Sequence, residues 1–483
     1  MNTSFRNATT ALLLIVAMWF SSCSDNQPDY IGVIPSDATA VAAIDLQSLA
    51  QKSDFAHSPL LTMGKKAAQL LIDKETQQKI DAIIDDPSLT GIDIKAPVYA
   101  FQTPNHFVGI TMRIDDSSAF EEFVNGLSSQ NLCSAVKEHD GLKWSALFDD
   151  IDFTFDDNTL LMMQKFDGIN SMSSEKATDM MLALMQLPTE ESIVSTDKFK
   201  NISKLEYKDM QAYFNLAAAP EVIASQIKDY IPSGISHQDI EMVIGVEFNN
   251  GEADAAIQLF SSKPKVQGIL DDFTHSFKSV SGDFINILPD NTRLWMTMGL
   301  NGEQAITQLK KIDKIKDMLM AINLGIDIDN IIRAIDGDAL VMVSTDDKTT
   351  LLATLGNTNF MNDISYWMES AREYGIKFSP CGNNQYCIQA DGRTFYFAVN
   401  DKQLYIGEEQ FTPELFNTAK HDNLLKDEIV GKNLFVHIDP HSQFGIINKV
   451  IVTADESGKL SLRAQTPNIK QNILYQLIKL WKL

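Results

Sequence analysis

Residues 34–46 read IPSDATAVAAIDL, in which a turn of proline, serine and aspartate leads into a short run of alanine and β-branched residues. Turn residues followed by such a run predict a β-strand that begins just after the turn. Residues 288–300 read LPDNTRLWMTMGL and align with the first stretch without a gap. A helix is predicted after each stretch, over 47–72 and 302–320. The chain therefore begins the same structural plan at two places.

The two copies share further landmarks in the same order. The sequence Gly-Ile-Asp-Ile stands at 91–94 and again at 325–328, and two strands and an amphipathic helix are predicted after each. A hairpin with Asp and Asn in its turn, a single strand, a strand pair and a final helix complete each copy. In the first copy these elements are predicted at 98–102, 107–114, 117–127, 153–163, 211–216, 243–259 and 264–278. In the second copy they are predicted at 339–344, 350–355, 359–374, 397–407, 433–438, 450–464 and 467–482. Such ordered recurrence predicts an internal duplication.

Strands that come as hairpins, with few helices between them, indicate the fold class. Strict alternation of strand and helix is absent, so the pattern predicts an α+β fold rather than a parallel sheet. We expect two tandem related domains, mainly of antiparallel sheets with helices packed on one face. The first repeat is predicted over 33–280, with an insertion at 164–205, and the second over 281–483. Each copy has roughly 200 residues, which is the size of a domain.

The first residues of the chain have the features of an export signal. Arg6 is the only charge before an apolar run, ALLLIVAMWF at 11–20, and two serines and Cys23 follow it. A positive start, a short apolar segment and small residues at the cut are typical of a secretory signal. The apolar run is too short to span a bilayer, which takes about 20 residues.

The stretch Phe20-Ser21-Ser22-Cys23 resembles the lipobox of bacterial lipoproteins, which are cut before the cysteine and acylated on it. The resemblance implies that residues 1–22 are a signal peptide, that Cys23 is lipidated and that 23–32 form a tether. An ordinary secretory signal with an incidental cysteine is the alternative. By the sorting rule of these lipoproteins, Ser24 after the cysteine implies the outer membrane, on its periplasmic or cell-surface face.

The lipobox, the polar tether, the opening at 34–38 and the Gly-Ile-Asp-Ile step together resemble a family of uncharacterised lipoproteins of Bacteroides-type bacteria (Bacteroidota). That family is classed as a domain of unknown function. The resemblance implies attachment to the cell envelope through the acyl chains on Cys23. It implies no catalytic residues and no assigned activity.

Charge and cysteine usage limit the partners and the compartment. The formal net charge is -24, with 64 acidic against 40 basic residues, which excludes the basic footprint that nucleic acid binding needs. If Cys23 is lipidated, three cysteines remain: Cys133, Cys381 and Cys387. Cys381 and Cys387 flank a short turn, so a local disulfide would form outside the cytoplasm. Buried free thiols are the alternative.

The segment His437-Ile438-Asp439-Pro440-His441 is the candidate metal site of the sequence. On a strand, His437 and Asp439 point to the same side, and His441 could join them beyond the proline. Imidazole and carboxylate groups hold divalent metals. The alternative is a strand that ends in a turn without any ligand.

A second polar cluster, Asp149, Asp150, Asp152, Asp156 and Asp157, has enough carboxylates for Ca²⁺, and a solvated turn is its alternative. The sequence contains no nucleophile elbow, no glycine-rich phosphate loop and no zinc-protease motif. It therefore predicts no catalytic residues, no enzyme activity and no cofactor. We expect a non-catalytic binding or assembly module with an envelope protein or a glycan as partner. The alternatives are a hydrolase or polysaccharide-handling enzyme with an unrecognised site, and a metal-dependent module.

Overall fold

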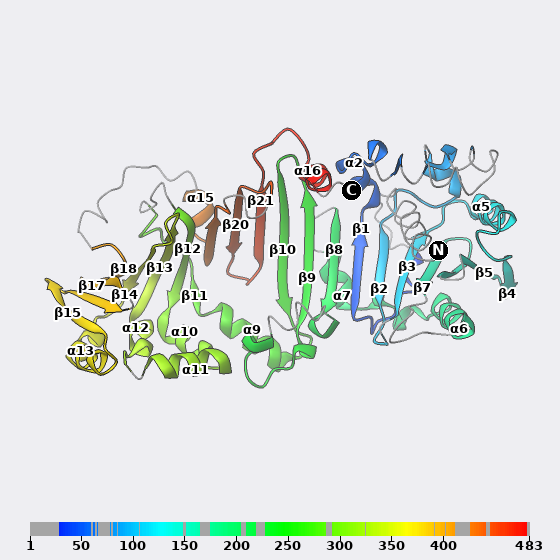
Figure 1. The fold of residues 1–483 in the computed structure, drawn as a ribbon. Helices are drawn as coiled ribbons and strands as arrows, with labels where there is room; N and C mark the ends of the chain where they lie inside the picture. Colours follow the sequence, from blue (N-terminus) through cyan, green and yellow to red (C-terminus); the bar gives the residue numbers. More distant parts are fainter. Residues whose placement is uncertain are drawn as a thin grey trace. The chain divides into compact units, whose positions relative to one another are not determined.

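The computed structural model describes the chain from residue 29 to residue 480 with gaps (Figure 1). The described residues are 29–58, 61–62, 65, 78, 81–84, 86–105, 107–147, 151–164, 174–203, 209–218, 228–285, 292–323, 325–390, 392–400, 402–410, 426–440 and 445–480. The chain divides into two compact units that alternate along the sequence. Unit 1 comprises Met1–Ala218, Val243–Ala255 and Asn468–Leu483, and unit 2 comprises Ala219–Met242 and Ala256–Pro467.

Unit 1 contains an antiparallel sheet in which eight described strands follow the order β8-β1-β2-β3-β7-β6-β5-β4. Figure 1 shows β1, β2 and β3 side by side in this sheet. The strands are β1 (Ala40–Ile44), β2 (Val98–Gln102), β3 (Val108–Arg113), β4 (Lys137–His139), β5 (Leu142–Leu147), β6 (Ile151–Phe155), β7 (Thr159–Gln164) and β8 (Met210–Asn215).

Four helices of unit 1 lie between these strands in the sequence, and a fifth, α16, follows at the C-terminal end of the described chain. They are α2 (Leu46–Lys52), α5 (Ser117–Ser129), α6 (Ser174–Met185), α7 (Asp197–Ser203) and α16 (Ile473–Leu480). Short 3-10 helices are η1 (Asp29–Ile31), η2 (Phe55–His57), η3 (Pro87–Thr90), η4 (Thr189–Glu191), η5 (Ile193–Ser195) and η6 (Leu216–Ala218). Helix α5 begins where the Asp116 carboxylate accepts a hydrogen bond from the backbone N–H of Ala119. Its buried Phe120 packs edge-to-face on Phe155 of β6, which fixes the helix on the sheet.

Unit 2 contains an antiparallel sheet in which ten described strands follow the order β21-β20-β19-β12-β13-β14-β18-β17-β16-β15. These strands are β12 (Thr292–Asn301), β13 (Ile335–Ser344), β14 (Thr349–Leu355), β15 (Lys377–Gly382), β16 (Gln385–Ala390), β17 (Arg393–Val399), β18 (Gln403–Gly407), β19 (Leu434–Ile438), β20 (Lys449–Ala454) and β21 (Leu460–Gln465). The short β11 (Phe277–Lys278) also pairs with β12, and the division between units runs through β9 (Glu241–Phe248) and β10 (Glu252–Phe260).

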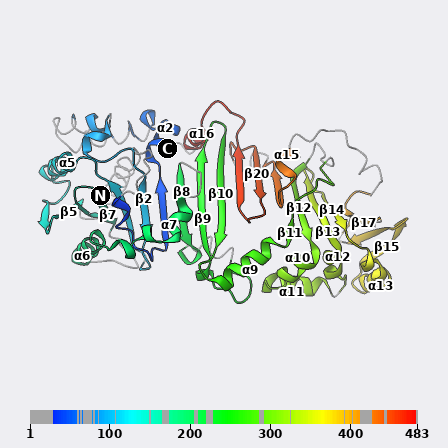
Figure 2. The same cartoon turned by 180° about the vertical axis from the view of Figure 1, so that it is seen from behind.

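The helices of unit 2 flank the ends of its strands. They are α9 (Pro264–Thr274), α10 (Gly302–Leu309), α11 (Asp313–Ile322), α12 (Ile328–Ala334), α13 (Ile364–Glu373) and α15 (Lys426–Ile429), with the 3-10 helices η7 (Lys228–Tyr230), η8 (His237–Asp239) and η9 (Asn359–Asp363). Figure 2 shows α13 beside β15, at the end of the sheet that the β15–β16 hairpin forms. The buried Trp367 of α13 packs edge-to-face on Phe397 of β17, so this helix covers an apolar core.

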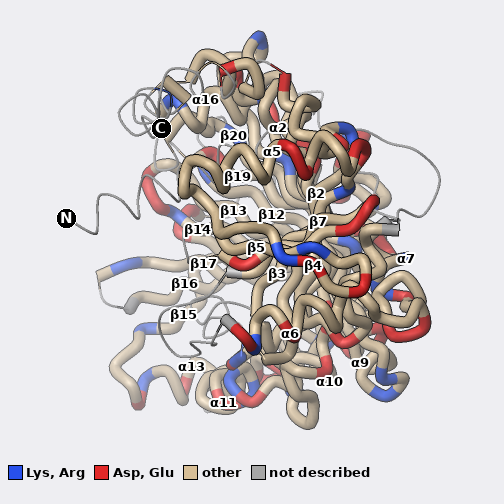
Figure 3. Tube along the Cα trace, turned by 90° about the vertical axis from the view of Figure 1, so that its right-hand side faces the viewer, with Lys and Arg blue, Asp and Glu red and all other residues tan. Residues whose placement is uncertain are grey.

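The antiparallel pairing and the mixture of helices and strands confirm the coarse fold class. The strand order β8-β1-β2-β3-β7-β6-β5-β4 in unit 1 matches β19-β12-β13-β14-β18-β17-β16-β15 in unit 2. The boundary between residues 280 and 281 stays a prediction. Acidic and basic positions are interspersed along the chain on the side seen in Figure 3. Among the described residues, no helix combines the length and apolarity that a membrane span needs.

Several predicted elements differ from the observed ones for physical reasons. The predicted helix 302–320 is two helices, because Ile312 turns its buried side chain into the core and caps α11 in an extended conformation. The helix predicted at 467–482 begins only at Ile473, where Asn472 accepts a hydrogen bond from the backbone N–H of Leu474. The hairpins β4–β5 and β15–β16 were not predicted, because β4 and most of β15 are exposed and carry no alternating apolar pattern.

Candidate functional site

The residues that the sequence singled out for lipidation and metal binding lie partly outside the described residues. Cys23 is outside them, and so is His441. His437 is half-buried on β19, between Trp295 and Ile451 on the neighbouring strands. Asp439 follows the strand, and its backbone N–H donates to the carbonyl of Arg293 at 2.8 Å. No group of three His, Cys, Asp or Glu side chains among the described residues could hold a metal, so the metal site stays a prediction.

His437 has an electrostatic environment that favours its neutral form. Its burial lowers its pKa below the usual value, the nearby Lys449 lowers it further, and Asp439 raises it. Within the described part of the chain, its Nδ1 is buried without a hydrogen-bond partner. A neutral imidazole is also the form that binds metals.

The acidic cluster contains a turn cap. Asp149 and Asp150 lie outside the described residues. Asp156 stands in the turn between β6 and β7, and one of its oxygens accepts hydrogen bonds from the backbone N–H groups of Asn158 and Thr159 at 2.8 and 2.7 Å. This is the role of a turn residue that satisfies local backbone groups. The structure therefore gives Asp156 a structural role, as in the alternative of a solvated turn.

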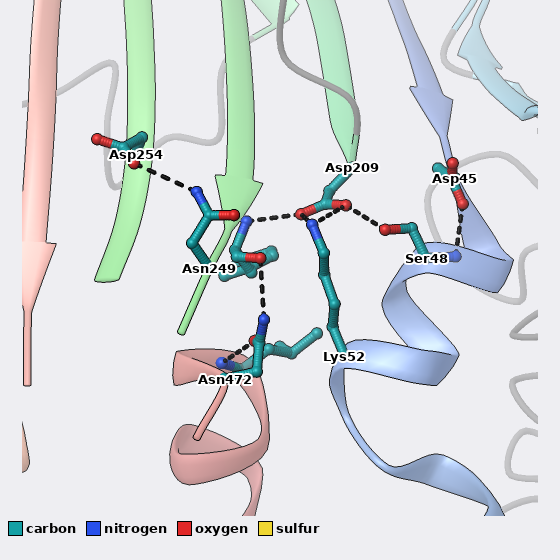
Figure 4. Close-up of polar contacts among 9 residues, drawn as sticks. Asp45, Ser48, Lys52, Asp209, Asn249, Asp254 and Asn472 are labelled. Atoms are coloured by element: carbon teal, nitrogen blue, oxygen red, sulfur yellow. Dashed lines mark hydrogen bonds and ion pairs between the residues drawn. The ribbon is translucent and has the colours of Figure 1, made fainter. Parts of the chain in front are cut away.

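A buried ion pair is the most prominent polar feature of unit 1 (Figure 4). Asp209 precedes β8 and has no exposed surface. Its carboxylate accepts two hydrogen bonds from Lys52 Nζ at 2.8 and 2.7 Å, one from Ser48 Oγ at 2.5 Å and one from the backbone N–H of Phe248 at 2.6 Å. Ser48 and Lys52 stand one turn apart on α2, so both reach the same carboxylate from one helix face. The pair thus ties α2 to β8 and β9.

Asparagine side chains extend this network to the C-terminal helix of the described chain. Asn472 Nδ2 donates to the carbonyl of Phe248 at 3.0 Å, and Asn249 Nδ2 lies 3.5 Å from a carboxylate oxygen of Asp254 (Figure 4). Asn250 and Asn472 also form an isolated antiparallel bridge. Segments that are 157 to 224 residues apart in sequence are joined in this way.

The geometry of this network indicates a structural tie. Three donor groups make four hydrogen bonds to the Asp209 carboxylate, which has no contact with solvent, so its lone pairs are not available to accept a substrate proton. Ser48 donates a hydrogen bond to this fully occupied carboxylate, so its hydroxyl is held inside the buried network. A buried aspartate with a complete set of charge-assisted hydrogen bonds is one that fixes local structure.

Asp338 of β13 is a comparable buried carboxylate in unit 2. It accepts hydrogen bonds from the backbone N–H groups of Ser281, Gly282 and Asp283 at 2.8, 2.7 and 2.9 Å, and from Ser281 Oγ at 3.1 Å. These donors hold the chain segment before β12 against the sheet. Both buried carboxylates therefore connect distant segments of one unit.

Unit 2 also contains an apolar pocket of about 300 Å³. It lies among the end of α11, the connection to α12, helix α13 and the β15–β16 hairpin. The lining residues include Ile322, Gly325, Ile326, Tyr374, Phe378 and Ile388. Phe378 and Ile388 are paired across the hairpin, and Cys381 and Cys387 form a disulfide near its tip. Of the two alternatives for Cys381 and Cys387, the structure has the disulfide and not the free thiols. Cys133 is a buried free thiol.

The fold and these sites define a protein of two antiparallel α+β units with buried polar ties in both units and an apolar pocket in unit 2. The chain belongs to the family described as "Domain of unknown function (DUF4836)", which matches residues 30–422. The expected membership of a family of unknown function is confirmed. The link of that family to lipoproteins of the Bacteroidota stays a prediction.

Comparisons with individual proteins add no functional argument. No curated protein matches the chain. Crystal form IV of TP0453 is similar at 13% identity and a TM-score of 0.28, over 48% of this chain and 81% of that chain. Crystal form I of TP0453 is similar at 12% identity and a TM-score of 0.28, over 52% of this chain and 88% of that chain. Such TM-scores support no inference about fold or function.

Sequence reasoning missed both the ion pair and the pocket. The only local signal of the ion pair is the spacing of Ser48 and Lys52 on a predicted helix, and Asp209 is 157 residues away from Lys52. The pocket depends on a helix break before Gly325 and on a hairpin that was not predicted. Both features arise from tertiary contacts that no local pattern encodes.

Proposed function

We propose that this protein is a lipoprotein anchored in the cell envelope whose folded body binds a ligand and catalyses no reaction. In this proposal residues 1–22 are removed on export and residues 23–32 tether the body to the outer membrane. The acyl chains on Cys23 attach the protein to the membrane, since two or more chains hold a protein firmly. The lipobox-like stretch that ends at Cys23 supports the anchor. An envelope protein or a glycan is the proposed partner class.

The structural observation that carries the proposal is the disulfide between Cys381 and Cys387. Disulfides form and persist in oxidising compartments and are rare in the cytosol. The disulfide and the N-terminal stretch come from opposite parts of the chain and support export independently. The fully occupied carboxylates of Asp209 and Asp338 support a structural role for the buried polar groups, which favours binding over catalysis.

We also infer that the body arose from two related domains, near 33–280 and 281–483. The matching strand orders of the two units support this inference. The pairing registers support it as well, because Ile44 of β1 pairs with Val98 while Met298 of β12 pairs with Ala339. The gapless alignment of 34–46 with 288–300 matches Ile44 with Met298. Val98 and Ala339 are the first residues of the next predicted strand in each copy.

The anchor is tested by metabolic labelling of native cells with an alkyne analogue of palmitate. We expect label on the wild-type protein and none on Cys23→Ala, because the substitution removes the acceptor thiol. The matched control is Cys133→Ala, which removes a cysteine of the body and should keep the label. Label on the Cys23→Ala protein, or no label on the wild type, would contradict the proposal.

A further inference from the structure

The apolar pocket of unit 2 has the size of a small-molecule site. Its volume is about 300 Å³, at the lower end of the range in which ligand pockets of proteins fall. A dry apolar cavity of about 150 Å³ in another protein holds one benzene molecule, so this pocket has room for roughly ten carbon atoms. A volume of this kind is too large to be a packing defect of a single methyl group.

The residues around the pocket are uncharged and mostly apolar. Ile326, Phe378 and Ile388 form its walls, and they belong to or pack against the apolar core of this end of unit 2. Tyr374 brings the only side-chain hydroxyl among the lining residues of the described chain. Within that lining no ionised group is available to pair with a charge on a ligand, and burying an unpaired charge is strongly unfavourable.

Large apolar side chains continue from the pocket to the surface. Tyr374 is 65% exposed and Ile322 is 42% exposed, although both line the pocket. Met318, one helical turn before Ile322 on α11, is 56% exposed. Exposed apolar groups that adjoin a cavity mark a binding site, and methionine adapts its shape to different ligands.

Gly325 keeps the pocket open. A Cβ added to Gly325 would meet only the carbonyl oxygen of Ile322, at 4.0 Å, so the space beside this glycine is empty. Its φ does not lie in the left-handed region, and the backbone there accepts other residues. The absence of a side chain at this position therefore contributes pocket volume and is not needed for the backbone conformation.

We propose that this pocket binds an uncharged, apolar molecule or chain of about ten carbon atoms. The volume sets the size, and the uncharged lining sets the chemical class. The net charge of -24 on the whole chain disfavours an anionic end group at the mouth. The inference rests on the proposed binding function and gives it a ligand class.

The test is a calorimetric titration of the acyl-free protein, residues 24–483, with 1-decanol and with decanoate. We expect 1-decanol to bind with one-to-one stoichiometry, and decanoate to bind at least about threefold more weakly because of its carboxylate. Gly325→Leu should fill the pocket and weaken 1-decanol binding at least tenfold. Gly325→Ala should keep most of the affinity. The matched control is Gly268→Leu on the exposed side of α9, where an added Cβ meets nothing within 4 Å.

A second variant keeps the test valid if Gly325→Leu does not fold. Ala321→Phe changes an exposed residue of the pocket lining and should also weaken binding at least tenfold. Co-sedimentation with phosphatidylcholine vesicles then distinguishes a membrane lipid from a free apolar molecule as the ligand. Vesicle binding that both substitutions block identifies a lipid chain as the ligand. Absence of vesicle binding identifies a free molecule. Absence of 1-decanol binding, or binding that neither substitution weakens, would overturn the inference. Acyl label on Cys23 is independent of these outcomes, so the anchor proposal stands or fails separately.

Discussion

The sequence Gly-Ile-Asp-Ile lies in different surroundings in the two units. In unit 1, Gly91 has a φ of +77°, and a Cβ added to it would lie 2.2 Å from the carbonyl oxygen of Asp116. In unit 2, the nearest atom to a Cβ on Gly325 is the carbonyl oxygen of Ile322 at 4.0 Å. The first glycine is packed against the start of α5, whereas the second lines the apolar pocket.

The residues that follow the motif explain the different local structures. In unit 1 the motif leads to Pro97, which lacks an N–H and disfavours a helical conformation of Ala96. In unit 2 the Asp327 carboxylate accepts a hydrogen bond from the backbone N–H of Asn330 and starts α12. The same tetrapeptide thus occurs once in each unit. The residues that follow it decide whether its glycine is packed against a helix, as Gly91 is, or lines a pocket, as Gly325 does.

The two glycines give the largest predicted contrast. Gly91→Ala should lower the free energy of unfolding by about 4 kcal/mol, because it adds a left-handed alanine and a clash with backbone atoms. Gly325→Ala should change it by less than about 0.5 kcal/mol or stabilise slightly. Urea unfolding of both variants measures the difference. Equal losses in the two variants would remove the contrast between a closed and an open site.

The ion pair offers a second contrast between corresponding positions. Ile44 pairs with Met210, and Met298 pairs with Leu434, so Asp209 corresponds to Asn433. Among the described residues, the buried Oδ1 of Asn433 has no hydrogen-bond partner, whereas the Asp209 carboxylate accepts four hydrogen bonds. One unit therefore uses a charged tie where the other has an uncharged amide.

Asp209→Ala should destabilise the protein by about 3 kcal/mol, because it leaves Lys52 without its partner in a mostly buried position. Asn433→Ala should cost less than half as much, because it removes an oxygen that makes no hydrogen bond within the described chain. Urea unfolding with unit-specific hydrogen exchange measures both. A larger loss in Asn433→Ala than in Asp209→Ala would be incompatible with this reading of the two sites.

The disulfide has a smaller predicted effect. Replacing Cys381 and Cys387 together by serine should lower the free energy of unfolding by at most about 2 kcal/mol, since a disulfide over so short a loop removes little chain entropy from the unfolded state. A reducing agent should destabilise the wild type to a similar degree and leave the double variant unchanged. A response of the double variant to the reducing agent would point to another redox-active group.

The smallest predicted effect is the pH dependence that His437 contributes. Its pKa is lowered in the folded protein, so the unfolded chain binds the proton more readily as the pH falls below about 6.5. Stability is therefore lost on acidification, with a slope of at most about 1.4 kcal/mol per pH unit for one group. The difference in unfolding free energy between the wild type and His437→Gln should shrink from pH 7.5 to pH 5. A difference that grows over this range would mean that the sign of the shift is wrong.

Buried strands were the elements that the sequence predicted best. The strand predicted at 98–102 matches β2 (Val98–Gln102), because it is a short apolar run in which Val98, Tyr99 and Phe101 are buried. The register between the copies was less predictable. The correspondence of 211–216 with 433–438 matched His437 with Asn215. Strand pairing places Tyr213 opposite Val41 and His437 opposite Trp295, so the counterpart of His437 is Tyr213. A shift of two residues keeps every side chain on the same face, so the apolar pattern cannot detect it.

The candidate sites were less predictable than the fold, for a physical reason. The lipobox-like stretch at Cys23 is a local signal and is readable without a structure. The Asp209 carboxylate gathers donors from α2 and β9, and the pocket at Gly325 needs a helix break and a hairpin to come together. Such convergence of distant segments is decided by packing, which a single sequence does not reveal.

The attachment of this protein to the envelope is tested most directly by the intact mass of the mature protein purified from native membranes. We expect a polypeptide that lacks residues 1–22 and carries acyl groups on Cys23 at its new N-terminus. An unmodified cysteine at that position, or a chain that retains residues 1–22, would contradict it.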